Sequence, residues 1–371
     1  MKNTSLQLPL LLVVAALVCC LPTSGAELPG WAKPRLQRLL RGGARSAAAH
    51  GRRSPVVEVT VAKNGSGDYR TIAAALAAAP KSTKKVRSSY TIRIGEGTYI
   101  EQLNITRRDV TLFGDGVGKT VITGNRGSLK HGDMPSSATV TASGRGFMAR
   151  DLTIQNTAGP EGNQSLALRS SSNHTVLYRC ELESFQDTLY AENGLQLYLD
   201  SVISGTVDFV FGNAKAVFQR CHLLVRRGRE GAHNIITAQG RDKPGDDTGF
   251  SFQNCSIMAK PNENLTGVET FLGRPWKNHS HVIFMQSFLD GIVHPKGWVE
   301  WDKSKHVLET TKTVSYMKFN NTGPGSDTSR RVNWEGFSVV DASKAEEYTV
   351  DRFIHGTQWL PNALNYKPGL Y

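Results

Sequence analysis

A repeat of about 21 residues constrains this 371-residue chain more than any other feature. The segment at 176–190 has a counterpart at 197–211, and each contains an apolar strand-like run followed by a more polar stretch with an aspartate. Cys180 corresponds to Ser201, and Asp187 corresponds to Asp208. Short apolar strands repeated at a period near 20 residues are typical of a β-solenoid, in which each repeat forms one coil.

The pattern continues beyond these two segments. A short apolar run, a polar residue and then Cys or Ser ends at positions 180, 201, 221, 255 and 287, at intervals of 21, 20, 34 and 32 residues. Such intervals fit coils in which some turns carry longer loops. We therefore predict an all-β, single-domain fold built as a parallel β-helix, with a strand at 57–61 and a short helix within 70–79. A sandwich of antiparallel strands is the alternative.

A solenoid would place the two aspartates together. Equivalent positions on successive coils lie about 4.8 Å apart, the spacing of neighbouring strands. Asp187 and Asp208 would then be stacked carboxylates, and a neighbouring like charge raises the pKa of one of them. One member becomes an acid and the other a nucleophile or base, so the spacing predicts a catalytic pair.

The two ends of the chain differ in character. Residues 1–26 are typical of a secretory signal peptide, with Lys2 before an apolar run and small residues at 24–26. A membrane anchor is the alternative, but the run is shorter than the ~20 residues of a spanning helix. Residues 27–55 hold seven Lys or Arg and one Glu, which predicts a basic linker or pro-segment. The folded domain is predicted at 56–371.

Net charge, sequons and histidine spacing indicate which partners the chain can have. The whole chain carries +12; Lys2 and the linker account for +7 of this, which leaves +5 for residues 56–371. A basic, secreted domain favours an acidic polysaccharide over nucleic acid. Eight Asn-x-Ser/Thr sequons after the predicted signal peptide fit a glycoprotein. The histidines lack metal-ligand spacing, so no metal is predicted.

Further polar residues could join the aspartates. Gln164 and Gln186 are 22 residues apart, about one coil, and two neighbouring amides could donate hydrogen bonds to one developing oxyanion. An internal amide ladder is the alternative role. The run from 272 to 276, Leu-Gly-Arg-Pro-Trp, supplies Arg274 and Trp276. A guanidinium near Asp208 would hold that carboxylate ionised, and an indole could stack on a sugar ring.

These motifs occur together in one known family. From about residue 57 to the C-terminus, the chain resembles the plant pectin methylesterases (pectinesterases). Five motifs in the family's order carry the resemblance: Gly97-Thr98-Tyr99-Ile100-Glu101, Gln164-Ser165-Leu166-Ala167-Leu168, Gln186-Asp187-Thr188-Leu189, Gly205-Thr206-Val207-Asp208-Phe209-Val210-Phe211-Gly212-Asn213-Ala214 and Leu272-Gly273-Arg274-Pro275-Trp276. The resemblance implies a right-handed parallel β-helix and no cofactor.

The resemblance also implies roles for the polar residues. Asp208 is the expected nucleophile on the methyl-ester carbonyl of a galacturonate unit of pectin. Asp187 is the expected proton donor to methanol and then the base that activates water. Gln186 and Gln164 are expected to stabilise the oxyanion, and Arg274 to orient Asp208 and meet substrate.

Four aromatic residues are candidates for the substrate cleft. Trp276 is expected to pack on a sugar ring, as the resemblance implies. Tyr190, Phe211 and Trp298 are further candidates for substrate binding. A place in the core is the alternative for all four, because large aromatic side chains are usually buried.

The chain departs from the family pattern at several positions, among them Phe271, where relatives usually have a tyrosine. Met134-Pro135 stands where relatives often have a substrate-contacting Thr and Phe, which affects substrate binding rather than the chemistry. Relatives often pair cysteines at the positions of Cys180 and Ser201, and the serine removes that partner. The resemblance leaves Cys221 and Cys255 as an expected disulfide across coils.

The resemblance implies a secreted, monomeric cell-wall enzyme that binds pectin. A proteinaceous pectinesterase inhibitor is a further expected partner, and no membrane contact is expected after signal cleavage. Arg38-Leu39-Leu40-Arg41, within the predicted linker, resembles the family's basic processing site. Two other functions remain open: a polygalacturonase-type glycosidase, which also uses paired carboxylates, and an inactive pectin-binding cell-wall protein.

Overall fold

The computed structural model describes residues 56–81, 88–301 and 307–371. These residues belong to the compact unit Ser54–Tyr371. The signal peptide predicted at 1–26 and the linker predicted at 27–55 lie outside the described residues.

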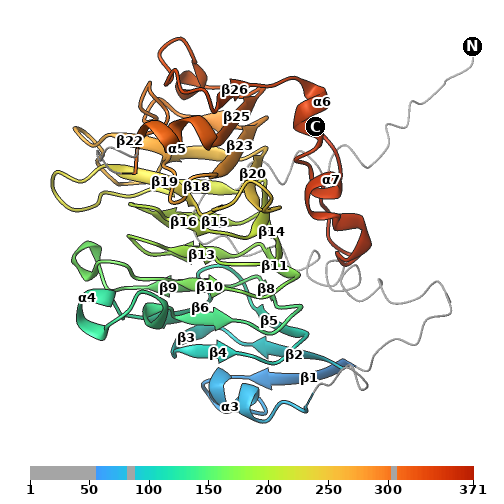
Figure 1. Ribbon diagram of the computed structural model, residues 1–371. Coiled ribbons are helices and arrows are strands. Elements are labelled where there is room, and N and C mark those ends of the chain that lie inside the picture. Colours follow the sequence, from blue (N-terminus) through green and yellow to red (C-terminus); the bar gives the residue numbers. More distant parts are fainter. Residues whose placement is uncertain (1–55, 82–87, 302–306) are drawn as a thin grey trace, which may run out of the picture. The chain divides into compact units, whose positions relative to one another are not determined.

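Three sheets form the walls of this unit (Figure 1). The long sheet contains, in order, β1 (Val56–Val61), β2 (Ser89–Ile94), β5 (Val110–Gly114), β8 (Met148–Arg150), β11 (Thr175–Tyr178), β14 (Leu195–Leu199), β17 (Lys215–Gln219), β20 (Gly249–Gln253), β23 (His281–Met285), β25 (Ser315–Phe319) and β26 (Phe337–Val339). The eight-stranded sheet contains β3 (Gly97–Ile100), β6 (Thr120–Gly124), β9 (Thr153–Asn156), β12 (Glu181–Glu183), β15 (Val202–Gly205), β18 (His222–Val225), β21 (Ser256–Ala259) and β24 (Phe288–Leu289). The seven-stranded sheet contains β4 (Leu103–Ile105), β7 (Val140–Ala142), β10 (Leu168–Ser170), β13 (Leu189–Ala191), β16 (Val210–Gly212), β19 (Asn234–Gln239) and β22 (Thr270–Gly273).

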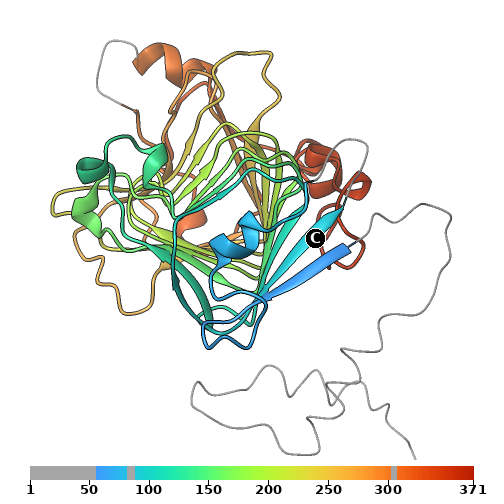
Figure 2. The same ribbon diagram turned by 90° about the horizontal axis from the view of Figure 1, so that it is seen from below.

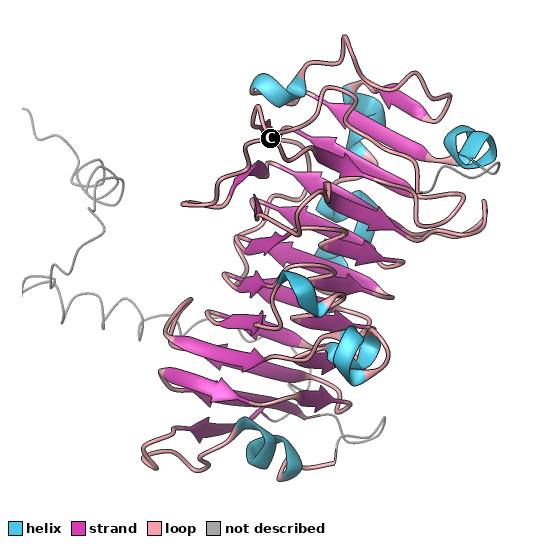
Figure 3. Ribbon diagram, turned by 90° about the vertical axis from the view of Figure 1, so that its left-hand side faces the viewer, coloured by secondary structure: helices cyan, strands magenta, loops and turns pink. Residues whose placement is uncertain are grey.

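The chain visits the three sheets in turn. β11, β12 and β13 belong to different sheets, and β14, β15 and β16 return to the same sheets in the same order. Each strand pairs in parallel with its equivalent on the next coil, as Leu177 pairs with Tyr198 and Leu182 with Ile203. The strands therefore stack in successive layers with the helices around them (Figure 3). The predicted right-handed parallel β-helix is confirmed, and the antiparallel sandwich is wrong.

Stacking in register also builds the core. Tyr198, Phe218, Phe252 and Phe284 occupy one inward-facing row of the long sheet. Neighbouring rings in this row stack with centroids 4.6, 4.5 and 4.6 Å apart. The three sheets surround this interior when viewed along the coils (Figure 2). Because such pairs add about 0.5–1.5 kcal/mol each beyond area burial, the row ties successive coils together.

Short helices lie at the ends and edges of the coils. They are α3 (Ile72–Ala77), α4 (Ser128–His131), α5 (Val307–Thr313), α6 (Ala342–Glu346) and α7 (Val350–Ile354), with 3-10 turns η1 (Pro135–Ser137), η2 (Pro160–Gly162), η3 (Pro324–Ser326) and η4 (Gly356–Gln358). α3 forms within the stretch predicted to be helical, and the Thr71 side chain caps it by accepting from the Ala74 amide. None of the described helices has the length and apolar character needed to cross a membrane.

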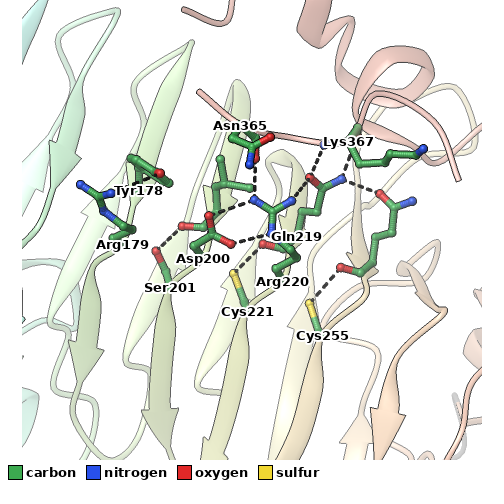
Figure 4. A network of polar contacts seen from close by, with 12 residues as sticks. Tyr178, Arg179, Asp200, Ser201, Gln219, Arg220, Cys221, Cys255, Asn365 and Lys367 are labelled. Atoms are coloured by element: carbon green, nitrogen blue, oxygen red, sulfur yellow. Dashed lines mark hydrogen bonds and ion pairs between the residues drawn. The ribbon is translucent and has the colours of Figure 1, made fainter. Parts of the chain in front are cut away.

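The C-terminal segment crosses the outer face of the long sheet. α7 packs against β14 and β17, and its apolar side chains cover the outward-facing residues there. Farther on, Gln219 exchanges two hydrogen bonds with the backbone of Lys367, each 2.8 Å long. Arg220 donates to the carbonyl of Asn365 and forms a two-bond ion pair with Asp200 (Figure 4). Side chains at the corner of the coils thus hold the end of the chain.

The predicted Cys221–Cys255 disulfide is not formed in the structure. The three described cysteines are buried free thiols. The repeat does place Cys180, Ser201, Cys221, Cys255 and Ser287 at the same point of successive coils, each two residues after a paired strand position. Burial and then the neighbouring Cys255 thiol raise the pKa of Cys221, so these two thiols lie close together without a bond between them. The thiols of Cys221 and Cys255 each donate to a carbonyl oxygen of the preceding coil, at 3.3 Å.

Candidate active site

The two aspartates lie one above the other on neighbouring coils. Each precedes a strand of the seven-stranded sheet by two residues, and these strands pair Leu189 with Val210. The amide of Asp187 donates to the Val207 carbonyl, next to Asp208, at 3.0 Å. Both aspartates have a left-handed backbone, with φ of 62° and 50°. Aspartate visits this region more readily than most residues, and such strained positions cluster at functional sites.

Burial gives the pair its electrostatic character. Asp187 is 7% exposed and Asp208 is 5% exposed. Burial, reinforced by the negative charge of Asp208, raises the pKa of Asp187 well above its ordinary value. Burial also raises the pKa of Asp208, but the hydrogen bonds and charge of Arg274 oppose that rise. The pair therefore binds one proton readily, and Asp187 is the member that holds it.

Arg274 binds the carboxylate of Asp208 from a position two coils farther along the chain. It follows β22 directly, and its Nε and Nη2 atoms donate to the two oxygens of Asp208 at 2.9 and 2.6 Å. A fork of this kind fixes the direction of the carboxylate as well as its charge. The guanidinium also lies over the ring of Trp301, 4.1 Å from the ring centroid, so its own orientation is fixed from a second side.

The two glutamines lie near Asp187: Gln186 is its neighbour in the chain, and Gln164 lies on the preceding coil. Gln186 is half-buried beside Asp187, and its carbonyl accepts from the Ser165 amide at 3.1 Å. Gln164 precedes that serine and is also half-buried. Its Oε1 accepts hydrogen bonds from Asn163 and Ser128. The stack thus brings the backbone of both predicted oxyanion residues to the level of the carboxylates.

Three of the predicted aromatics form one surface beside the carboxylates. The rings of Tyr190 and Phe211 stack, with centroids 4.4 Å apart, at paired positions of β13 and β16. Trp276 meets both rings edge-on, at 6.2 and 5.9 Å. A Cβ on Gly240 would lie 2.7 Å from the indole, so only glycine there lets Trp276 take this place. Met134, from the departure in the family pattern, packs against the same cluster.

The structure does not bring Trp298 to this surface. Its ring is 1% exposed and stacks on Tyr316 in the interior, with centroids 3.9 Å apart. The exposed aromatic next to Arg274 is instead Trp301, which the sequence analysis missed. The two tryptophans stand three residues apart, and the sequence does not show which of them turns inward.

A metal site would need a cluster of ligating side chains. Within the described ranges, no group of three or more His, Cys, Asp or Glu side chains is arranged to hold a metal ion. The carboxylates, amides and guanidinium are residue types that an acyl-transfer reaction can use as nucleophile, proton donor and oxyanion-stabilising groups.

Comparisons with known proteins identify relatives along most of the chain. The pectinesterase family model matches residues 58–357. Probable pectinesterase/pectinesterase inhibitor 17 of Arabidopsis thaliana is 41% identical over 352 residues, which cover 94% of this chain and 65% of that protein. Pectinesterase 2.1 of Solanum lycopersicum is 40% identical over 351 residues, which cover 93% of this chain and 61% of that protein. The chain thus spans roughly three fifths of these relatives' length.

Solved structures of pectin methylesterases have the same fold as this chain. The pectin methylesterase from carrot aligns with a TM-score of 0.80 at 38% sequence identity, over 88% of this chain and 100% of that one. A pectin methylesterase from Aspergillus niger aligns with a TM-score of 0.71 at 31% identity, over 86% of this chain and 100% of that one. With the family match over most of its described length, this chain belongs to the pectinesterase family.

Proposed function

We propose that the protein is a secreted pectin methylesterase, which hydrolyses the methyl esters of galacturonate units and releases methanol. One observation carries the proposal: a buried pair of stacked aspartates in which Arg274 binds only one member. That asymmetry separates the pKa values of two like groups, so that one is a carboxylate and the other an acid at the same pH. Ester cleavage through a covalent intermediate needs both.

The first half of the reaction forms an acyl-enzyme. A carboxylate oxygen of Asp208 attacks the ester carbonyl, and the charge that develops on the carbonyl oxygen is stabilised by the side-chain amides of Gln164 and Gln186. The bond to the methoxy group then breaks, and Asp187 gives its proton to the leaving oxygen. Methanol departs, and Asp208 is joined to the galacturonyl group as an anhydride.

The second half restores the enzyme. Asp187, now ionised, takes a proton from a water molecule that attacks the anhydride. The bond to Asp208 breaks, the product leaves as a galacturonic acid that then gives its proton to solvent, and both aspartates return to their starting protonation. Arg274 serves throughout by keeping Asp208 oriented and by favouring its ionised form, which is both nucleophile and leaving group.

The surroundings of the pair suit a sugar acid polymer. The half-buried rings of Tyr190 and Trp276, packed on the buried ring of Phe211, offer apolar faces of the kind on which sugar rings stack. The net charge of +5 on residues 56–371 favours a polyanion. Secretion and a cell-wall location are proposed from the signal sequence and the eight sequons.

The experiment is to incubate purified protein with highly methylated pectin and to measure methanol and reducing ends in the same samples. We expect methanol without new reducing ends. Reducing ends without methanol would establish the glycosidase alternative. Binding to pectin without either product would leave a cell-wall binding protein.

A further inference from the structure

The side chain of Gln164 is held only by its oxygen end. Its Oε1 accepts hydrogen bonds from Nδ2 of Asn163, at 2.8 Å, and from Oγ of Ser128. Within the described part of the chain, no side chain or carbonyl accepts from its Nε2. An amide oxygen has two lone pairs, so these two donors saturate it and leave the NH2 group as the end available to a ligand.

Which end of the amide faces the site decides what Gln164 can do. An amide NH2 stabilises an oxyanion, whereas an amide oxygen in the same place would repel it. Rotating the amide by 180° would place NH2 against Nδ2 of Asn163, which is a donor only. Asn163 therefore sets the sense of the amide, and the Ser128 hydroxyl adds a second bond that holds it there.

Ser128 is fixed to the Gln164 loop through its backbone as well. It begins α4, it is 8% exposed, and its amide donates to the Gln164 carbonyl at 2.9 Å. The preceding residue, Gly127, lies so close to η2 that an added Cβ would be 2.2 Å from the Gly162 oxygen. The loops that carry Ser128 and Gln164 therefore touch backbone to backbone, and the hydroxyl cannot move away without separating them.

From this geometry we infer that Ser128 is a positioning residue for the oxyanion-stabilising amide of Gln164. The inference rests on the proposed function. Ser128 does not itself meet substrate. It keeps Oε1 occupied, so that Nε2 is presented to the ester oxygen before the reaction begins, and a preorganised donor stabilises the transition state more than one that must be reoriented.

The test compares Ser128→Ala, which removes the hydroxyl, with Ser128→Thr, which keeps it. We expect Ser128→Ala to lower kcat for methylated pectin about tenfold and to change KM less than about twofold, since the lost interaction acts in the transition state. Ser128→Thr should recover most of the rate. Ser136→Ala is the matched control: this exposed serine lies in the same stretch, and its hydroxyl donates to the carbonyls of His131 and Asp133.

A double-mutant cycle separates positioning from a general structural effect. Gln164→Ala alone should lower kcat about 10²-fold, the usual cost of one oxyanion donor. If Ser128 acts through Gln164, adding Ser128→Ala to Gln164→Ala should cost less than about a further twofold. Melting temperatures of all variants, measured in parallel, show whether a rate loss follows unfolding.

The outcomes are distinct. A wild-type kcat for Ser128→Ala, or the full tenfold loss again in the Gln164→Ala background, would overturn the inference while the wild-type enzyme still releases methanol. A folded wild-type protein that releases no methanol would instead refute the proposed function, and with it the reaction that Ser128 is inferred to serve.

Discussion

Replacing Arg274 by glutamine tests the electrostatic basis of the site. Arg274 makes two hydrogen bonds to Asp208, at 2.9 and 2.6 Å, and that carboxylate is 5% exposed. Glutamine keeps a donor but removes the charge. Leaving one member of a fully buried ion pair unpartnered costs about 3–5 kcal/mol. Because the Arg274 side chain is 23% exposed, we expect a smaller loss of unfolding free energy, about 2–3 kcal/mol at pH 7.

The sign of the pH dependence follows from the pKa of Asp208. Arg274 lowers that pKa against the effect of burial, so its removal raises the pKa further. At pH values below the ordinary aspartate range, the carboxyl is protonated in both the folded and unfolded states, and the substitution costs little. As pH rises, the unfolded chain ionises while the folded variant resists, so the loss of stability grows between about pH 4 and pH 7. The acid limb of kcat/KM should move to higher pH for the same reason.

Two assays check this prediction: denaturant unfolding at pH 4 and pH 7, and the pH dependence of methanol release. Arg274→Lys is the control, since it keeps the charge but loses the fork and the stacking on Trp301. It should fall between the wild type and Arg274→Gln in both assays. Unchanged unfolding free energy at both pH values, together with an unshifted acid limb, would show that Arg274 does not hold Asp208 ionised.

Three further predictions follow from other parts of the structure. Asp187→Asn should reduce methanol release at least about 10²-fold, since it removes the acid and base. Because burial raises the pKa of Asp187, the unfolding free energy of the wild type should fall as pH rises from about 4, and the variant should lack this decline. Equal pH slopes of the unfolding free energy in the two proteins would contradict the assignment. Trp276→Ala should raise KM about tenfold and leave kcat within about threefold, since stacking acts in the bound ground state as well; an unchanged KM would place the ring outside the sugar contacts. Deletion of residues 365–371 removes the hydrogen bonds to the side chains of Gln219, Gln253 and Gln286. It should lower the unfolding free energy by about 2–4 kcal/mol with little change in kcat. A large loss of kcat in the folded protein would contradict a purely structural role for this segment.

The repeat revealed much of the fold because one period fixes many contacts at once. A shift of 21 residues matches Leu189 with Val210, and this register alone brings Asp187 and Asp208 together. No spacing rule reaches Arg274 in the same way. The two following coils carry loops of other lengths, so Val210 pairs with Thr237, and Thr237 with Gly273. Its place beside Asp208 was expected only because the motif resembles that of a known family.

The errors also have physical causes. Cys221 and Cys255 occupy equivalent positions, as the repeat requires, and the stack brings their thiols together, but they remain free. Trp298 and Trp301 point in different directions: the backbone of Trp298 forms a bridge with Gly273 and its ring is buried in the core, whereas the ring of Trp301 is exposed. Such choices depend on tertiary packing, which a single sequence does not display.

The most direct test of the account is methanol release from highly methylated pectin by the wild-type protein and by Asp208→Asn, with folding of both checked by circular dichroism. An asparagine in this place keeps the shape of the side chain and lacks the nucleophilic carboxylate. The account predicts release by the wild type and a loss of at least about 10³-fold in the variant. Release by Asp208→Asn within tenfold of the wild type would contradict the role of Asp208 as nucleophile.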